Sequence, residues 1–220
     1  MPRTARASVG GVCFHALCRG NACRRVFHKV EDFAAFAAML EEASGRLPMR
    51  LLGWCLMPNH FHLVLWPLGD GDLSRWMQWL LTAHVRRYHR HYRSSGHVWQ
   101  GRFKAFPIQE DEHLLVVLRY VERNALRARL VRRAEQWRWC SLRALAGEPG
   151  GVPLHRGPAP RGDDWIDWVN QPQSEAELSA LRKSIARCTP FGGESWQRTT
   201  ADRLGLESSL RPRGRPRLNA

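Results

Sequence analysis

Apolar and strand-forming residues are concentrated in four short segments of the chain, and residues 9–18 also alternate between apolar and polar positions, which predicts β-strands. The predicted strands cover residues 9–18, 49–57, 60–66 and 101–109, and Pro58 and Asn59 form the turn between the second and the third. Apolar residues at helical spacing predict amphipathic helices over residues 31–43, 72–92 and 111–131. Gly45 is expected to end the first of these helices.

These elements follow one another in the order β-α-β-β-α-β, with one more helix behind the last strand. The order predicts an α+β protein with a ferredoxin-like, or palm, antiparallel sheet. The additional helix carries Tyr120, and its apolar stripe consists of Leu114, Val117, Leu118 and Val121. We expect a first domain over residues 9–146.

Proline and glycine are frequent in residues 147–163, which predicts a linker or a meandering surface segment. A helical C-terminal extension is expected over residues 164–220. It contains a predicted helix over residues 174–188, where Ser174 caps the N-terminus and Glu177 occupies the capping-box position. A second short helix is expected over residues 196–204.

The chain ends in a basic tail, residues 211–217, in which arginines alternate with proline and glycine. The tail resembles an AT-hook, whose extended strip lies in a narrow minor groove where arginines meet a strong negative potential. Arg213 and Arg215 would make those contacts. A solvated basic tail that binds phosphate without preference is the other interpretation, and either one places DNA nearby.

The formal net charge is +14 and the isoelectric point lies near 10.8. Arginine dominates the basic residues, because only Lys29, Lys104 and Lys183 are lysines, and arginine suits phosphate and base contacts. We therefore expect a polyanionic partner, and acidic substrates and membrane surfaces are the competing explanations of the charge.

No apolar run approaches the roughly 20 residues of a membrane span. The N-terminus lacks a signal-peptide core, so we expect a cytoplasmic, nucleoid-associated protein with six reduced cysteines.

His60 and His62 lie two residues apart in a strongly apolar predicted strand. Side chains at i and i+2 of a strand point to the same face, so both imidazoles can approach one metal ion while Phe61 enters the core. The alternative is a pair of half-buried polar groups without a ligand. A metal site therefore needs a further partner.

Tyr120 is the tyrosine that we expect to supply chemistry, out of three in the chain. Asn124 lies four residues later and hence on the same face of the predicted helix, one turn away. Without the two histidines, Tyr120 would be interpreted as an ordinary amphipathic core residue.

Three separated segments resemble motifs of the single-tyrosine HUH transposases, and especially of the REP-associated tyrosine transposases. The segments are Met57 to Val64, Trp99 to Lys104 and Tyr120 to Ala128, in the same order and spacing, and the resemblance covers about residues 9–145. Arg19-Gly20-Asn21 followed by Val26-Phe27-His28 also resembles that group. The chain departs from the pattern where Ala125 replaces a usual proline and where Arg129 replaces a common glycine.

The resemblance implies a metal-dependent single-strand DNA endonuclease and strand transferase, which cleaves near hairpins through a 5′-phosphotyrosine intermediate. Tyr120 would be the nucleophile, and His60, His62 and the amide oxygen of Asn124 would bind Mg²⁺ or Mn²⁺. The DNA partner would be single-stranded or hairpin DNA. The protein would act as a monomer or a homodimer, without a membrane partner.

Basic residues suited to hold the strand lie in three places. The end of the second helix carries Arg86, Arg87 and Arg90 with Tyr88 and Tyr92 interleaved, a pattern typical of backbone contact combined with base stacking. A merely solvated helix end is the alternative. The other candidates are Arg102, Lys104 and Arg19.

Other functions compete with cleavage. The chain could be a hairpin-binding architectural or regulatory protein derived from a transposase, which Ala125, Arg129 and the tail favour slightly. An RNA-recognition module is disfavoured because histidines occupy the strand that would carry stacking aromatics. A metallohydrolase that activates water is disfavoured because no carboxylate base adjoins the histidines.

Overall fold

The computed structural model describes residues 7–147 and 152–211 of the chain. Its centre is a four-stranded antiparallel sheet with strand order β2-β3-β1-β4. The strands are β1 (Cys13–Arg19), β2 (Met49–Met57), β3 (His60–Pro67) and β4 (Lys104–Ile108). This order and the βαββαβ sequence of elements confirm the predicted ferredoxin-like α+β fold.

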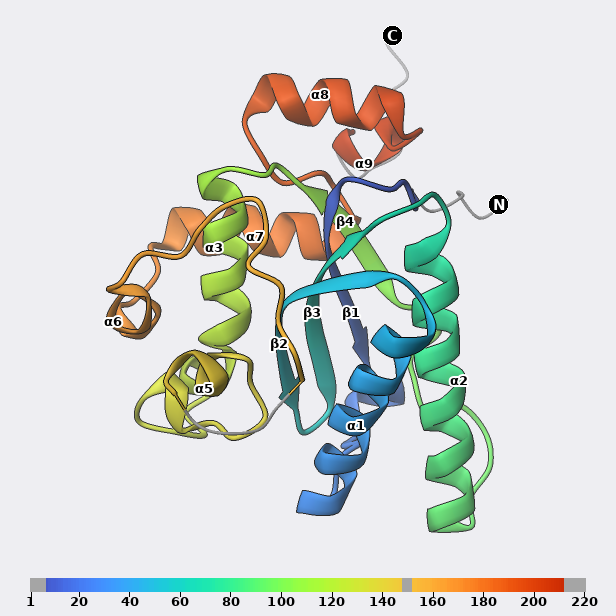
Figure 1. Ribbon diagram of the computed structural model, residues 1–220. Helices are drawn as coiled ribbons and strands as arrows, with labels where there is room; N and C mark the ends of the chain where they lie inside the picture. Colours follow the sequence, from blue (N-terminus) through green and yellow to red (C-terminus); the bar gives the residue numbers. More distant parts are fainter. Residues whose placement is uncertain (1–6, 148–151, 212–220) are drawn as a thin grey trace, which may run out of the picture.

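Two long helices cover one face of the sheet (Figure 1). They are α1 (Val30–Arg46) and α2 (Asp72–Tyr92), and Phe36 and Trp76 are among their fully buried residues. The prediction that Gly45 ends α1 was wrong, because the helix continues to Arg46 and closes at Leu47. His84 of α2 is fully enclosed by the rings of Phe27, Phe36 and Trp99, whereas the neighbouring Val85 is only partly buried.

The opposite face of the sheet packs against α3 (Glu112–Glu122), whose stripe of Leu114, Val117, Leu118 and Val121 is buried as predicted. Asp111 caps the helix by accepting a hydrogen bond from the backbone N–H of His113 at 2.9 Å. The predicted single helix over residues 111–131 was wrong in one respect. It is interrupted at Arg123, and a short α4 (Asn124–Arg127) follows.

The Pro/Gly-rich segment is attached to the outer strand β2 where the structure describes it. The backbone N–H of His155 donates to Leu51 O at 2.8 Å, and the Arg161 side chain donates to Leu52 O at 2.5 Å. Val152 and Ala159 are buried. This segment therefore lies against the sheet domain over residues 152–161, and the division of the chain at residues 147 and 163 stays a prediction.

Five short elements form the remainder of the described chain: α5 (Leu142–Leu145), α6 (Trp165–Asn170), α7 (Glu175–Arg187), α8 (Glu194–Arg203) and α9 (Glu207–Leu210), with 3₁₀ turns at Asn21–Cys23 and Ala134–Gln136. The capping box of Ser174 and Glu177 at the start of α7 is confirmed, and α8 confirms the second short helix. The sequence did not predict α5 or α6. The AT-hook-like tail with Arg213 and Arg215 lies outside the described residues.

None of the six cysteines forms a disulfide, and Cys13, Cys18, Cys55 and Cys140 are buried. Across the described ranges, the structure contains no helix long and apolar enough to span a membrane.

Candidate active site

The register of the sheet determines which side chains meet beneath α3. Arg19 of β1 lies opposite His60 of β3, and Leu17 lies opposite His62. Directly opposed residues in an antiparallel pair point to the same face, so these four side chains share one face of the sheet. Phe61, between the two histidines, packs on the other face against Phe36 and Trp99, as the sequence predicted.

Three histidine rings form a continuous row on this face. The rings of His60 and His62 have centroids 5.0 Å apart and lie nearly perpendicular, at 87°. The ring of His62 also lies nearly coplanar with that of His15 of β1, at 13°, and Nδ1 of His62 is 2.8 Å from Nε2 of His15. Nδ1 of His60 lies 2.7 Å from Oδ1 of Asn59. In both His60 and His62 the Nδ1 atom is thus engaged, and Nε2 is left for a ligand.

The three imidazoles are neutral at physiological pH. Burial lowers the pKa of His60 to about 4, assisted by the charges of Arg19 and Arg127. Burial lowers the pKa of His15 to about 3, and the pKa of His62 is also held well below its usual value, by burial and then by the neighbouring His15 and His60. A neutral imidazole offers the nitrogen lone pair that a metal ion requires.

Tyr120 is brought to the histidines by α3, near the end of that helix. Its ring centroid lies 5.8 Å from that of His62, edge to face, and 6.3 Å from that of His15. The side chain is buried, with 7% of its surface exposed. The structure therefore brings together His60, His62 and Tyr120, which the sequence singled out from two separate segments.

Arg127 lies over the ring of Tyr120, with its guanidinium carbon 4.0 Å from the ring centroid. Burial lowers the pKa of this arginine, which still remains cationic because arginine titrates far above neutrality. Among the described residues, no carboxylate lies within ion-pair distance of Arg127, and its Nη1 has no hydrogen-bond partner. A half-buried cation that has no carboxylate partner in the described chain, and that lies beside Tyr120, provides a position for an anionic group.

Asn124 begins α4, one turn beyond Tyr120, and is 4% exposed. Arg123 keeps a helical backbone conformation at φ −80° and ψ −4°, so the change from α3 to α4 preserves the four-residue relation of Asn124 to Tyr120. The side-chain nitrogen of Asn124 has no hydrogen-bond partner. The unpartnered atom is a donor, so it does not itself mark a metal ligand, and the ligand role of the Asn124 amide oxygen stays a prediction. Two imidazoles and one amide oxygen would suit Mn²⁺ or Mg²⁺.

Glu122 holds the end of α3 in place. It is fully buried and accepts hydrogen bonds from Ser141 Oγ at 2.8 Å and from Trp165 Nε1 at 2.7 Å, while Arg161 lies 3.4 Å away. Burial raises the pKa of this carboxyl, and the Arg161 charge and these hydrogen bonds oppose the rise. The network ties α3 to α6 and to the segment along β2, which fixes the position of Tyr120 two residues earlier.

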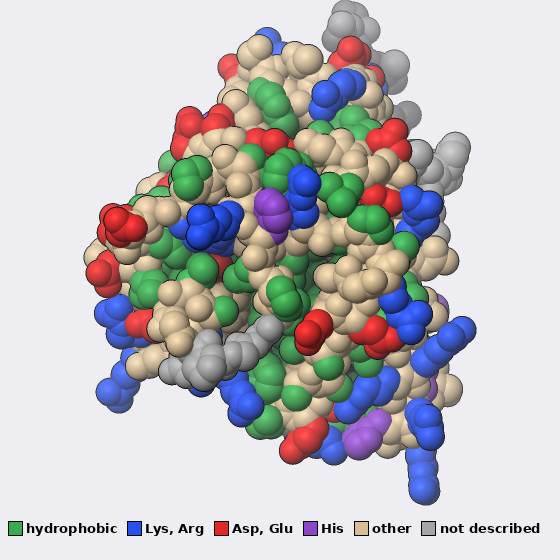
Figure 2. All heavy atoms as spheres, viewed as in Figure 1, with side chains coloured by type: hydrophobic (Ala, Val, Ile, Leu, Met, Phe, Trp, Pro, Cys, Tyr) green, Lys and Arg blue, Asp and Glu red, His purple; other side chains and the backbone are tan. Residues whose placement is uncertain are grey.

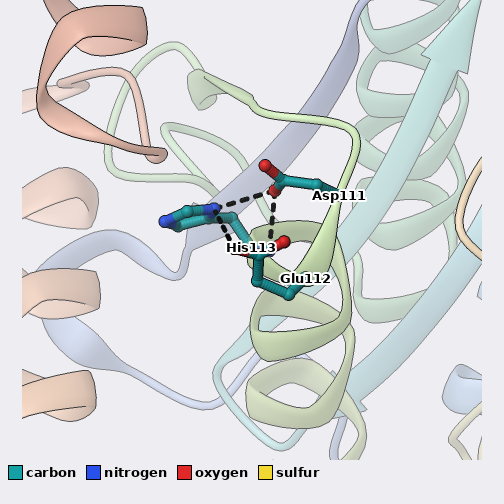
Figure 3. A group of neighbouring side chains, drawn as sticks. All are labelled: Asp111, Glu112 and His113. Atoms are coloured by element: carbon teal, nitrogen blue, oxygen red, sulfur yellow. Dashed lines mark hydrogen bonds and ion pairs between the residues drawn. The ribbon is translucent and has the colours of Figure 1, made fainter.

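A second group of possible metal ligands lies at the other end of α3, where Asp111, Glu112 and His113 converge (Figure 3). Asp111 already accepts hydrogen bonds from the backbone and from Nδ1 of His113, so the group is explained by helix capping. Eight helical residues separate it from Tyr120, a rise of about 12 Å. It is therefore not part of the His60 and His62 arrangement.

The predicted DNA-binding residues differ in their exposure to solvent and in whether their side chains already have a partner inside the protein. Arg19 is exposed and adjoins His60. Arg86 and Arg102 line one cavity of about 790 Å³ between α2 and the segment before β4. Arg90 is exposed, whereas Arg87 forms an ion pair with the buried Asp32 at 3.6 Å.

Lys104 is occupied by the end of α7, where its Nζ lies 3.4 Å from the carbonyl oxygens of Ile185 and Ala186. The hydroxyl of Tyr92 donates to Asp32 at 2.5 Å, and the hydroxyl of Tyr88 lies 3.1 Å from His28. Both hydroxyls are therefore used inside the protein, and base stacking by these rings stays a prediction.

Basic side chains gather over the C-terminal half of α2 (Figure 2). That end of α2 lies at the same end of the molecule as the β2–β3 turn (Figure 1), although α2 and α3 cover opposite faces of the sheet. The segment after α2 is joined to β1 by the backbone hydrogen bonds of Gln100 N–H to Arg19 O at 2.8 Å and of Asn21 N–H to Val98 O at 2.8 Å. The segment after α2 is thus attached to the end of β1 that carries Arg19.

Two residues of the site were missed by the sequence interpretation, His15 and Arg127. His15 interrupts an otherwise apolar strand, Cys13-Phe14-His15-Ala16-Leu17-Cys18, and that interruption was the available signal. Arg127 lies seven residues after Tyr120, two helical turns away on the same face, but it appeared as one of many arginines in a basic chain.

Comparison with known proteins identifies the family of this chain. The family model described as "Transposase IS200 like" matches residues 8–124, which is more than half of the chain. The protein belongs to the IS200-like transposase family.

Two relatives refine the comparison. A Haemophilus influenzae protein assigned as a REP-associated tyrosine transposase is 25% identical over 118 residues, which are 49% of this chain and 66% of that protein. The match thus covers slightly less than two thirds of the relative. The solved structure of a REP-associated tyrosine transposase bound to a REP hairpin aligns with a TM-score of 0.55 at 16% identity, over 71% of this chain and 96% of that one. This likeness supports the fold.

Proposed function

We propose that this protein is a metal-dependent single-strand DNA endonuclease and strand transferase of the REP-associated tyrosine transposase kind. The observation that carries the proposal is that Tyr120 packs against the two histidines of β3. The ring centroid of Tyr120 lies 5.8 Å from that of His62, which in turn lies 5.0 Å from that of His60. A solved relative with the same fold is bound to a REP hairpin, so the proposed substrate is a DNA hairpin with a single-stranded flank.

In the proposed reaction, the hydroxyl oxygen of Tyr120 attacks the scissile phosphorus. A bond forms between the tyrosine oxygen and phosphorus, and the bond between phosphorus and the 3′ oxygen breaks. The phenolic proton is lost and the departing 3′ oxygen gains one, so the products are a 5′-phosphotyrosine and a free 3′-hydroxyl. Attack by a new 3′-hydroxyl reverses these changes, and no ATP is needed because the phosphodiester energy is retained.

His60 and His62 would hold a divalent ion through their Nε2 atoms, with the amide oxygen of Asn124 as a third ligand. Bound Mg²⁺ or Mn²⁺ would polarise the scissile phosphate. The protein's own contribution is to keep the imidazoles neutral through burial and to hold Tyr120 rigidly beside them through the Glu122 network.

Arg127 supplies the positive charge for the phosphate in this proposal. Its guanidinium lies over the Tyr120 ring and has no carboxylate partner among the described residues. A preorganised charge costs no reorganisation when negative charge develops in the transition state. The same contact keeps the Tyr120 ring in one orientation.

The second candidate function is hairpin binding without cleavage. It is favoured by Arg129, which replaces the glycine common in relatives and adopts a left-handed backbone at φ 58°. Arg129 N–H donates to Leu126 O at 2.9 Å and Leu130 N–H to Ala125 O at 3.0 Å, the hydrogen bonds of a Schellman cap in which glycine is preferred. The substitution strains the cap of α4 and removes no reactive group, so cleavage stays the primary proposal.

A denaturing gel with labelled hairpin oligonucleotides, taken from DNA flanking the gene, separates the two functions. Wild-type protein and His60→Ala are incubated with and without Mn²⁺ or Mg²⁺. The proposal expects a metal-dependent cut by the wild type alone. Hairpin binding by both proteins in a parallel native gel, without a cut in any lane of the denaturing gel, would favour the binding function.

A further inference from the structure

His15 is a buried polar residue with no evident structural role. The side chain is completely buried, with the ring of Phe106 4.9 Å away at 80° and the ring of Tyr120 6.3 Å away at 77°. Its Nδ1 has no hydrogen-bond partner, and its single polar contact among the described residues is Nε2 to Nδ1 of His62, at 2.8 Å.

A core position of this kind would ordinarily hold phenylalanine. Aromatic neighbours surround the ring, and an imidazole nitrogen that is buried without a partner destabilises the fold. The rings of His15 and His62 are nearly coplanar, at an interplanar angle of 13°, and meet edge to edge through the two nitrogens. What phenylalanine cannot provide is a hydrogen-bond acceptor for His62.

We propose that His15 is a positioning residue that fixes the tautomer and the orientation of His62. The inference rests on the proposed metal-binding role of the His60 and His62 pair. A histidine that binds a metal ion through one ring nitrogen usually donates the N–H of the other to a fixed acceptor. This hydrogen bond sets the ring orientation and determines which nitrogen faces the metal.

The hydrogen-bond logic allows two arrangements of protons. In the first, Nδ1–H of His62 donates to Nε2 of His15, and the lone pair of His62 Nε2 is free for a metal ion. In the second, Nε2–H of His15 donates to Nδ1 of His62, whose proton then occupies Nε2 and blocks coordination. The metal-competent state is the first, and it places the proton of His15 on the unpartnered Nδ1. No net proton is gained or lost between the two.

Mn²⁺ affinity measured by electron paramagnetic resonance, on the full-length protein without DNA, tests the inference independently of cleavage. His15→Phe keeps the ring shape and removes the acceptor, and should weaken Mn²⁺ binding by about 10–100-fold. His15→Gln retains an oxygen acceptor and should bind within a few-fold of wild type. The matched control is His84→Phe, a buried histidine on the other face of the sheet, which should leave the affinity unchanged.

Nitrogen-15 NMR of the wild-type histidine rings provides a second readout that needs no variant. With Mg²⁺ bound, Nδ1 of His62 should carry the proton and Nε2 of His15 should not. The opposite pattern, or a His15→Phe protein that is folded and binds Mn²⁺ like wild type, would overturn the role of His15 alone. Wild-type protein that binds no Mn²⁺ would overturn the metal site as well, which separates the two failures.

Discussion

The ring of Tyr120 stands at 89° to the ring of His62, with centroids 5.8 Å apart, although one residue comes from α3 and the other from the central strand β3. The contact depends on two independent anchors. The register between β1 and β3 places His62 on the face beneath α3, and the buried Glu122 network fixes the end of α3. Tyr120, the proposed nucleophile, and the imidazoles are thereby held together by the protein itself.

Loss of Arg127 should slow cleavage more than it weakens binding. Arg127→Gln should lower the single-turnover cleavage rate about 10²–10³-fold, as expected when a preorganised charge is removed from a transition state. Arg127→Lys should recover part of the loss. Hairpin affinity, measured by fluorescence anisotropy, should change only a few-fold. Equal cleavage by Arg127→Gln and wild type would show that this cation has no role in the reaction.

Arg86 and Arg102 should each account for about one phosphate contact. Arg86→Gln or Arg102→Gln should reduce the slope of log affinity against log salt by about one, uniformly across DNA sequences. Arg46→Gln is the control, because Arg46 already pairs with Glu42 at 2.8 Å and lies at the end of α1. If all three variants kept the wild-type slope, the cavity between α2 and β4 would not lie on the DNA path.

His84 should make stability dependent on pH. Burial lowers its pKa to about 3 in the folded protein, with Arg87 lowering it further and Asp32 opposing, whereas the unfolded value is near 6.5. Between these values the unfolded chain binds the additional proton, so the free energy of unfolding falls as pH falls below about 6.5. One such group contributes up to about 1.4 kcal/mol per pH unit.

The measurement is urea unfolding of wild type and His84→Phe at pH 7 and pH 5.5. Other buried histidines make both proteins less stable in acid, so the informative quantity is the difference between them. The variant should lose about 1 kcal/mol less than wild type over this interval. An identical loss in both proteins would mean that His84 is protonated in the folded state as readily as in the unfolded chain.

Restoring glycine at position 129 should stabilise the protein. A left-handed backbone costs a residue with a Cβ roughly 1–2 kcal/mol, and glycine avoids this cost while losing some chain entropy. Arg129 is exposed and has φ 58°. Arg129→Gly should therefore raise the free energy of unfolding by about 1 kcal/mol and leave cleavage unchanged. A destabilised variant would show that the arginine side chain makes a compensating contact.

Much of the fold was predictable because the sheet follows simple periodic rules. The bounds of β2 and α2 agree with the predicted residues 49–57 and 72–92, since a nearly continuous apolar run between Pro48 and Pro58 defines the strand and a long amphipathic stripe defines the helix. The break at Arg123 was not predictable from spacing, because its backbone stays close to helical and only the hydrogen-bond pattern changes. Likewise, Gly45 lies inside α1 and does not end it, and a Cβ added at this position would meet no neighbouring side chain within 4 Å.

The candidate site was only partly predictable for a different reason. The pair His60 and His62 stands out through strand periodicity, and Tyr120 through the small number of tyrosines. His15 becomes meaningful only through the β1–β3 register, and Arg127 only through its position over Tyr120. Both relations depend on contacts between segments that are brought together only by folding, and these contacts cannot be deduced from a single sequence.

The most direct test of the account is the identity of the residue that becomes joined to DNA. A hairpin oligonucleotide with a nicked or shortened flank, which traps the intermediate, is incubated with wild type and Tyr120→Phe in Mn²⁺, and the proteins are digested and analysed by mass spectrometry. The account predicts a 5′-phosphorylated DNA fragment on the wild-type peptide that contains Tyr120, and no adduct in the variant. An adduct on Tyr88 or Tyr92, or a metal-dependent cut without any covalent adduct, would contradict it.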